Sequence, residues 1–437
     1  MSGNVIINNN KVRWGLSALL AVLLLFSTFH TVFSLFAFAL FCLVIFFCDR
    51  EFILLQMFFI MPMASIFKMA PDAQSFFTIV LLLYIVFHLV LPRNATAIII
   101  LFAVYIVVMQ LIMGEFDLLR TIKLVCNILF LSSVLNNQVK TRHREIFLSY
   151  IIGNIVASVI ALMDSPTFKI VSYVGIKAIG DPDKGTQVTR FAGLYADPNY
   201  YSVGLIISLC LLVVLYHRNE LKVLPSVLLA CPIMYFLIIT YSKSAVIMIL
   251  LILVFLLYSL TVKKKFVPII IFSFSAVVII VLAISGQVPA LQVVVERFMA
   301  SDTLDGLDVN KLTTGRFNLW MTYAKHIIQN LRVIIFGNSI TAGLIGDRGA
   351  HNTYIDVFYY LGSVGTTLLL ASLKAILTQS TRIKIKRNIL NYSVLICILI
   401  MYFFLSELFY YDPPFHIFLA FLLINLPLSK RQNCKLR

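Results

Sequence analysis

Long apolar stretches alternate with short polar ones along almost the whole chain. About fourteen of them approach the roughly 20 residues that a helix needs to cross the hydrocarbon core of a bilayer. The pattern predicts an all-α, polytopic membrane bundle of about 12–14 transmembrane helices, and no small-residue cleavage site follows the first, which we expect to be retained. The predicted spans lie near residues 14–29, 31–48, 52–68, 76–91, 96–113, 119–135, 146–163, 200–216, 222–240, 243–260, 266–285, 353–375, 390–406 and 415–428.

Two polar segments, residues 164–199 and 286–352, are much longer than the other connections between the predicted spans. Loops longer than about 15 residues are usually functional or disordered. No change of composition marks off a soluble domain, so we interpret residues 1–437 as a single membrane domain. The two long segments are then extracytoplasmic loops, and we expect the longer one to be catalytic.

The longer loop has a helical pattern of its own. Apolar side chains recur at spacings of three and four residues, a periodicity typical of an amphipathic helix; they are Phe317, Trp320, Met321, Ala324, Ile327, Ile328 and Leu331. A helix of this kind lies along a membrane surface or covers a cavity.

Charge is distributed in a way that supports this topology. The chain is 61% apolar, only 12% charged, and has a net charge of +16, which excludes an ordinary soluble domain. Lys and Arg gather in short cytoplasmic loops, and with a cytoplasmic N-terminus every second predicted loop and the C-terminal tail together account for the entire net charge. Both termini are therefore predicted to be cytoplasmic, and the sequence shows no clustered basic surface of the type that binds nucleic acid.

Cysteine and metal chemistry find little support in the sequence. The seven cysteines lie within or beside predicted spans or in the C-terminal tail, and none falls in a predicted external loop. Disulfides and cysteine metal sites are therefore not expected. Because the external loops contain no Asp and His cluster at metal-ligand spacing, we expect neither a metal nor a cofactor.

Three predicted spans begin on the external face with polar residues that are able to cap a helix. Asp197 followed by Pro198 has the form of an N-cap with proline at the first helical position, and Arg190 lies shortly before it. A helix start alone explains this pattern, but a helix N-terminus also attracts anions. The other two starts are the Thr240–Ser244 turn, which contains Lys243, and His351–Asn352.

Arg316 occupies an unusual place for an arginine. If Thr313 or Thr314 caps the amphipathic helix, Arg316 lies in its first turn, where a cation opposes the helix dipole. The alternatives are an anion to bind or a solvated surface arginine. His351 also has two interpretations, a hydrogen-bonded core residue or a catalyst. A lone histidine beside a span is more often the former.

Taken together, two arginines, a histidine and several helix N-termini on one face fit a substrate whose leaving group is a phosphate or pyrophosphate. Arginine binds phosphate oxygens in a bidentate manner, and neutralising a departing charge is often the largest catalytic contribution. His351 is placed to take a proton from an attacking hydroxyl. Further candidate bases are Asp347, Asp356, Glu407 and Asp412.

In these motifs the sequence resembles the O-antigen ligase and polymerase superfamily of multi-span bacterial glycosyltransferases. Arg190–Asn199 is similar to its Arg-x-x-Gly and Pro-Asn motif, Gly315–Trp320 to its Gly-Arg and Trp motif, and Gly337 with His351–Tyr354 to its Gly and His-Asn motif. The resemblance covers about residues 186–375.

The resemblance implies a helical bundle with an external cavity and a glycan donor carried on undecaprenyl pyrophosphate. Transfer to an acceptor hydroxyl would need neither metal nor nucleotide sugar. Arg190 and Arg316 would bind pyrophosphate and His351 would orient or deprotonate the acceptor, while the substrate-binding residues would be Lys243, Asn199, Asn352, Tyr354 and Trp320. Many relatives have Ser-Arg where this chain has Ser242-Lys243, and lysine lacks the fork for bidentate contact.

The family contains two activities: repeat-unit polymerases and ligases that transfer polymer to lipid A core. The residues in the motifs favour a repeat-unit polymerase for O-antigen, capsule or exopolysaccharide over a ligase. The resemblance further implies the bacterial cytoplasmic membrane, with membrane lipid, a flippase and a chain-length regulator as partners. A transporter is the alternative from another class, suggested by the number of spans and by Lys123 within one of them.

Overall fold

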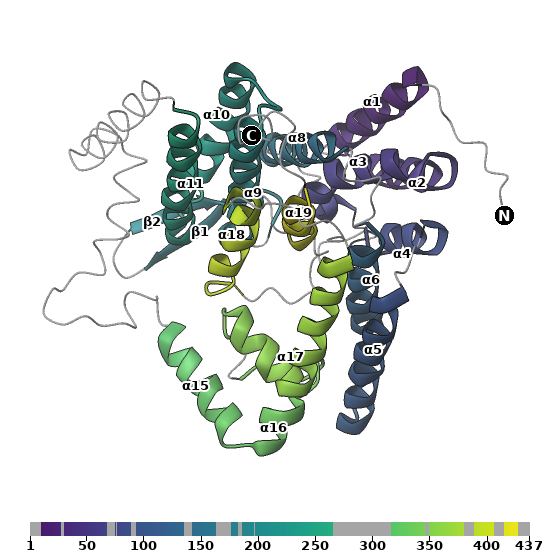
Figure 1. Cartoon of the computed structure of the whole chain (residues 1–437), viewed down its shortest axis with the longest axis vertical. Coiled ribbons are helices and arrows are strands. Elements are labelled where there is room, and N and C mark those ends of the chain that lie inside the picture. The colour runs from purple at the N-terminus through teal and green to yellow at the C-terminus, as the bar shows by residue number, and fades with distance from the viewer. Residues whose placement is uncertain are drawn as a thin grey trace, which may run out of the picture.

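The computed structural model describes residues 10–27, 30–67, 75, 77–88, 93–134, 142–162, 176–181, 186–195, 197–264, 316–345, 349–379, 389–405 and 415–426. Within these ranges the regular structure is helical apart from one β-hairpin, in agreement with the predicted all-α class. In Figure 1, α5, α6, α10 and α11 run up and down the view and α2, α3, α4 and α8 run across it, with α15 and α16 at the lower end.

Within the described residues, seven α-helices precede the hairpin. They are α1 (Asn10–Phe26), α2 (Thr31–Phe47), α3 (Arg50–Ile60) continued by a 3₁₀ segment (Met61–Ile66), α4 (Phe77–His88), α5 (Arg93–Met113), α6 (Leu118–Val134) and α8 (His143–Leu162).

The hairpin, which the hydrophobic pattern did not predict, lies in the first long loop. Its antiparallel strands are β1 (Ile176–Asp181) and β2 (Thr186–Phe191). After it come α9 (Pro198–His217), α10 (Val223–Ile239), α11 (Lys243–Val262), α15 (Arg316–Ile328), α16 (Leu331–Phe336), α17 (Thr353–Gln379), a 3₁₀ segment (Ile389–Tyr392), α18 (Ser393–Met401) and α19 (Phe415–Ile424).

The predicted spans correspond closely to these helices. Each coincides with a helix within a few residues, except the one near 266–285, which lies outside the described residues. By length and composition, five helices in the described ranges are able to cross a membrane: Thr96–Met113, His143–Leu162, Pro198–His217, Lys243–Val262 and Thr353–Thr378. Several shorter apolar helices accompany them, so the number of spans stays a prediction.

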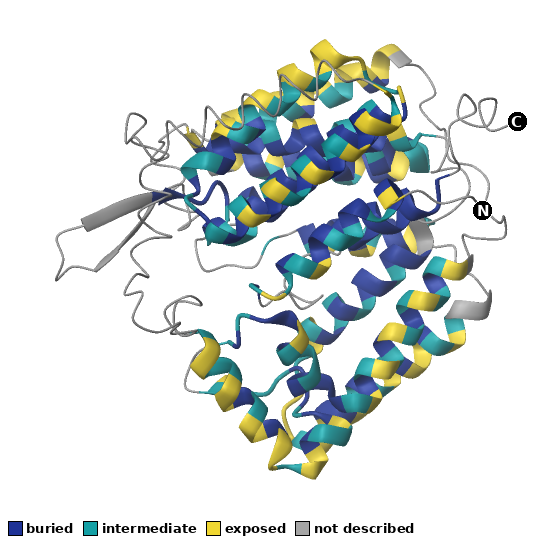
Figure 2. Ribbon diagram, turned by 60° about the vertical axis from the view of Figure 1, so that its left-hand side comes forward, coloured by how far each residue is buried: buried dark blue, intermediate teal, exposed yellow. Residues whose placement is uncertain are grey.

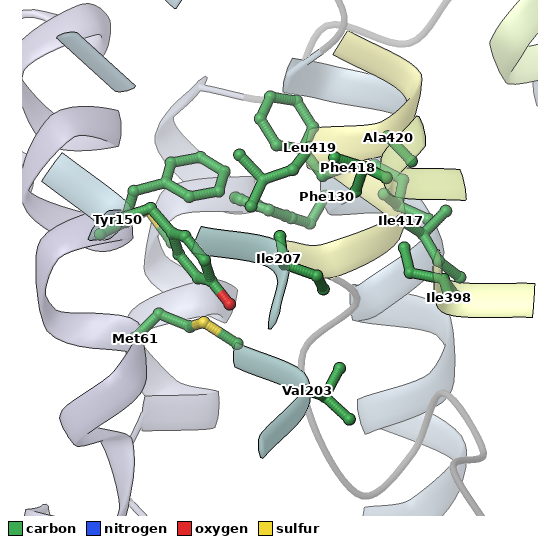
Figure 3. Close-up of a cluster of buried hydrophobic side chains, with 14 of the residues drawn as sticks. Met61, Phe130, Tyr150, Val203, Ile207, Ile398, Ile417, Phe418, Leu419 and Ala420 are labelled. Carbon is green, nitrogen blue, oxygen red and sulfur yellow. The ribbon is translucent and has the colours of Figure 1, made fainter. Parts of the chain in front are cut away.

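Helix α9 forms the centre of the bundle. Of its 20 residues, 17 are buried. In its most apolar 18-residue window 89% of the residues are buried, whereas the same windows of the other long apolar helices are 28–56% buried. Val203 and Ile207 lie among side chains of α18 and α19, including Ile398 and Phe418 (Figure 3). A helix enclosed on all sides is apolar on all sides, whereas the outer helices turn exposed residues outward (Figure 2).

Helix α17 is interrupted at Gly362, whose φ of 60° and ψ of −171° are not helical. The break packs against Gly337, which follows α16 and has a φ of 72°. A Cβ on Gly362 would lie 2.4 Å from the Gly337 nitrogen. From α5, the Tyr105 hydroxyl lies 2.6 Å from the Phe336 carbonyl oxygen and 2.7 Å from that of Leu361. The two glycines thus let the end of α16 and the break in α17 meet backbone to backbone, and the Tyr105 side chain of α5 bridges them.

The predicted amphipathic helix is present as α15, but its buried face differs from the expected one. Tyr323 and Ile327 are buried, whereas Met321 and Ile328 are 55% and 72% exposed. The Tyr323 hydroxyl accepts a hydrogen bond from the Ile345 amide at 3.2 Å and its ring packs edge-on against Tyr359. Tyr323 is therefore held inward together with Ile327, whereas Met321 and Ile328 of the predicted apolar stripe face away from the bundle.

A group of ion pairs joins the predicted cytoplasmic ends of α8 and α9. The carboxylate of Glu220 lies 2.8 Å from the His143 ring and 2.8 Å from the Arg218 guanidinium. The neighbouring Arg142 contacts Glu51 of α3 at 2.7 Å. The loop after α9 is thereby attached to the start of α8, which is in turn attached to α3.

Candidate functional site

Arg190 is the penultimate residue of β2 and is only 5% exposed. Its Nε donates to the Thr240 carbonyl oxygen at 2.8 Å, and its Nη2 donates to Asn199 Oδ1 at 3.3 Å. The buried arginine therefore joins the hairpin to the start of α9 and to the turn between α10 and α11.

The predicted caps at these two helix starts are confirmed. Asp197 is the N-cap of α9, where its carboxylate accepts from the Asn199 amide at 2.6 Å, and Pro198 takes the first helical position. Ser242 caps α11 and accepts from the Ala245 amide at 3.3 Å. Lys243 is the first residue of α11 and is half-buried.

Arg316 begins α15 and approaches the same region from the long loop. Its Nη1 donates to the Phe404 carbonyl oxygen at 2.8 Å. Burial lowers the pKa of Arg316, while the electrostatic influence of Asp197, with a smaller one from Tyr200, raises it. The guanidinium therefore lies within electrostatic range of the Asp197 carboxylate at the start of α9. The residues before Arg316 that were expected to cap α15 lie outside the described ranges.

Trp320 ties α15 to the residue before His351. Its ring nitrogen donates to the Ala350 carbonyl oxygen at 2.8 Å, and the Ala350 amide donates to Asp356 Oδ1 at 3.3 Å. His351 is half-buried and has a φ of 50°, an uncommon conformation for a residue other than glycine. Asp356 is 2% exposed, and the other candidate bases lie outside the described ranges.

Asn352 and Tyr354 begin α17 as the sequence predicts. Asn352 Oδ1 accepts from the Tyr354 amide at 3.0 Å and from the Ile355 amide at 3.3 Å, which is an N-cap. The Tyr354 hydroxyl donates to the Leu399 carbonyl oxygen at 2.7 Å, and its ring lies 4.7 Å from that of Phe403. The contacts recorded for these two residues are thus with the protein itself.

Sequence reasoning missed the segment that follows α18. Thr353 donates its amide to the Tyr402 carbonyl oxygen at 2.8 Å and its hydroxyl to that of Leu405 at 2.7 Å. Between these two acceptors lies Phe404, which holds Arg316. Backbone carbonyl groups carry no sequence signal, so only the fold reveals that this segment connects Arg316 to the start of α17.

The structure thus brings the predicted residues together through two sets of contacts. One contains Arg190, Asn199 and the start of α11, and the other contains Trp320, the Ala350 backbone next to His351 and the start of α17. Arg316 is linked to both sets, because Asp197 acts on it electrostatically and its guanidinium binds the segment after α18.

The chain matches no protein-family model, no curated protein and no solved structure. Its function therefore has to be argued from the residues and their arrangement.

Proposed function

We propose that the protein is a membrane glycosyltransferase that acts at the external face of the bacterial cytoplasmic membrane. It moves a glycan from undecaprenyl pyrophosphate to the hydroxyl of a lipid-linked acceptor glycan, as the resemblance to the O-antigen ligase and polymerase superfamily implies. The observation that carries the proposal is that two buried or part-buried arginines from separate loops are held beside helix starts: Arg190 donates to Asn199 in the first turn of α9, and Arg316 donates to the Phe404 carbonyl oxygen in the segment that also binds Thr353 of α17.

The two arginines suit the donor end of such a reaction. A guanidinium keeps its charge when buried, so it is able to neutralise a pyrophosphate in a dry site. Arg316 is positively charged yet lies in the first turn of α15, where the helix dipole opposes a cation. An anionic ligand would offset that cost, which favours the anion-binding role over a solvated surface residue.

His351 suits the acceptor end. Its backbone has a positive φ, a conformation that costs energy and that clusters at functional sites. In the proposed reaction the acceptor oxygen forms a bond to the anomeric carbon as the bond to the pyrophosphate oxygen breaks. The acceptor proton passes to His351, the electron pair leaves with the lipid pyrophosphate, and the arginines stabilise that charge.

Within the family we propose a repeat-unit polymerase, with a ligase acting on lipid A core as the alternative. A flippase that delivers the donor and a chain-length regulator are the partners that the polymerase would need. A transporter has less support, because Lys123 is the sixth residue of α6 rather than a mid-helix residue, whereas transport sites lie near the bilayer midplane.

The test is the surface glycan and its lipid-linked precursors in a strain that lacks the gene, resolved by gel and mass spectrometry. Single repeat units alone are expected for a lost polymerase, and long chains left on the lipid carrier would indicate a ligase. Re-introduced Arg316→Ala and His351→Ala proteins should reach the membrane but restore no polymer. Wild-type polymer from both variants would contradict the proposed site, and an unchanged glycan in the deletion strain would favour transport.

A further inference from the structure

Ser242 lies at the centre of a buried hydrogen-bond cluster that joins the starts of α9 and α11. It is 1% exposed, and its hydroxyl lies 2.7 Å from Asn199 Oδ1, 2.9 Å from Ser244 Oγ and 3.3 Å from the Ala245 amide. The serine thus contacts the amide group that also receives Arg190.

The direction of each hydrogen bond in this cluster follows from the chemistry of its members. A guanidinium has no acceptor, so the atom of Asn199 that faces Arg190 has to be its carbonyl oxygen. Ser242 then has to donate its single proton to the same oxygen. Because that proton is used, Ser244 donates to Ser242, and the Ala245 amide supplies its second accepted bond.

The orientation of the Asn199 amide is therefore fixed. Its oxygen receives Arg190 at 3.3 Å and Ser242 at 2.7 Å, so its NH₂ group turns away from both. Asn199 is half-buried and two residues from Asp197, whose charge acts on Arg316. Of the two hydrogen bonds that Asn199 Oδ1 accepts, the one from Ser242 is the shorter.

We infer that Ser242 is a positioning residue for the donor pyrophosphate, acting through Asn199 and, through it, on Arg190. This rests on the proposed function. Without the serine hydroxyl, Asn199 keeps only the longer contact and its amide is able to rotate, which weakens its hydrogen bond with Arg190. Lys243 follows Ser242 directly and lacks the arginine fork, so the planar donors here are Arg190 and Asn199.

The test is glycan transfer by the purified full chain in lipid nanodiscs, with lipid-linked donor and acceptor varied separately. Ser242→Ala should raise the donor KM about tenfold, the usual scale for loss of one buried hydrogen bond, with the acceptor KM unchanged. A loss confined to kcat would indicate less folded enzyme and would overturn the assignment. Ser226→Ala, a serine of α10 whose hydroxyl bonds the Lys222 carbonyl oxygen, is the matched control and should behave as wild type.

A double-mutant cycle identifies the route of the effect. In the Asn199→Ala protein, Ser242→Ala should have no further effect on the donor KM, because the group that it holds is gone. Losses that multiply would overturn the inference while leaving the proposed function intact. A wild-type protein that transfers no glycan under any condition would instead overturn the proposed function, and the donor role of Ser242 with it.

Discussion

Arg316 carries its charge in a place where burial opposes it. Its pKa is lowered by desolvation, and the nearby Asp197 and Tyr200 only partly compensate. One guanidinium nitrogen holds the Phe404 carbonyl oxygen. An arginine is able to make that bond and still present its other nitrogens in one plane, which a lysine is not.

Arg316→Lys should therefore lower donor transfer at least tenfold even though the charge is kept, since bidentate contact with an oxyanion is lost. The measurement is the rate of lipid-linked glycan transfer in nanodiscs. Arg332→Lys, at an exposed position of α16, is the control and should retain the wild-type rate. Equal rates for both lysine variants would argue for a simple charge at Arg316.

At this scale the sequence predicted the helix caps better than the contacts. Asp197, Ser242 and Asn352 cap helices as their residue types suggest, because a cap depends on a few neighbouring residues. The partners of Arg316 and Trp320 are backbone carbonyl groups of residues far along the chain, and such acceptors have no side-chain signature. Lys243 was predicted to bind substrate, and that assignment stays a prediction.

Helix α17 owes its shape to two glycines that face each other. The hydrophobic pattern predicts a continuous span, because an apolar run does not reveal a single residue with positive φ. Gly362 breaks the helix, and Figure 1 shows the axis of α17 changing direction between its two ends. The break keeps the His351 end of α17 beside α15 while its other half packs along α5. The β-hairpin likewise escaped prediction, since a polar loop shows little period-two alternation of apolar residues.

Gly337→Ala should destabilise the protein more than most single substitutions. A Cβ there would lie 2.4 Å from the Tyr360 carbonyl oxygen, and the φ of 72° alone costs a residue with a side chain about 1–3 kcal/mol. Thermal unfolding of the purified protein measures the loss. Gly343→Ala is the matched control, since a Cβ at that position meets nothing within 4 Å. Equal melting temperatures for the two variants would contradict the proposed packing of the glycines.

The whole molecule has a predicted membrane topology that reporter fusions are able to test. The loop that contains Asn219 is predicted to be cytoplasmic and the segment around Gly343 external, because Lys and Arg concentrate in alternate loops. Alkaline phosphatase, which is active only outside the cytoplasm, should be inactive when fused after Asn219 and active when fused after Gly343. The opposite pattern would reverse the topology and place the arginines on the cytoplasmic face.

The ion pairs at the predicted cytoplasmic end give the fold a dependence on pH. Burial opposes ionisation of Glu220, but hydrogen bonds and the charges of His143 and Arg218 hold its pKa below the ordinary value of 4.5. A carboxylate with a lowered pKa stabilises the fold fully above the ordinary value, and that stability is lost as the pH falls through the lowered one. Wild-type protein should therefore lose stability on acidification between about pH 5 and 3.

Glu220→Gln should weaken the dependence of stability on pH, because a glutamine side chain does not titrate. Melting temperature against pH is the measurement, and Glu115→Gln, at an exposed position, should keep the wild-type slope. If the Glu220→Gln curve followed the wild-type curve through the acidic range, the carboxylate would not be the group responsible.

Helix α9 is held at both of its ends and enclosed along its length. Asp197 and Asn199 anchor its first turn within the external cluster, and the loop that contains Glu220 attaches its other end to α8. A 20-residue helix is about 30 Å long and nearly incompressible. In the predicted topology, contacts at the cytoplasmic end of α9 therefore help to set the depth at which Asn199 and Arg190 lie in the bilayer. A force that moves the loop containing Glu220 would then move the cluster around Asn199 by about the same distance.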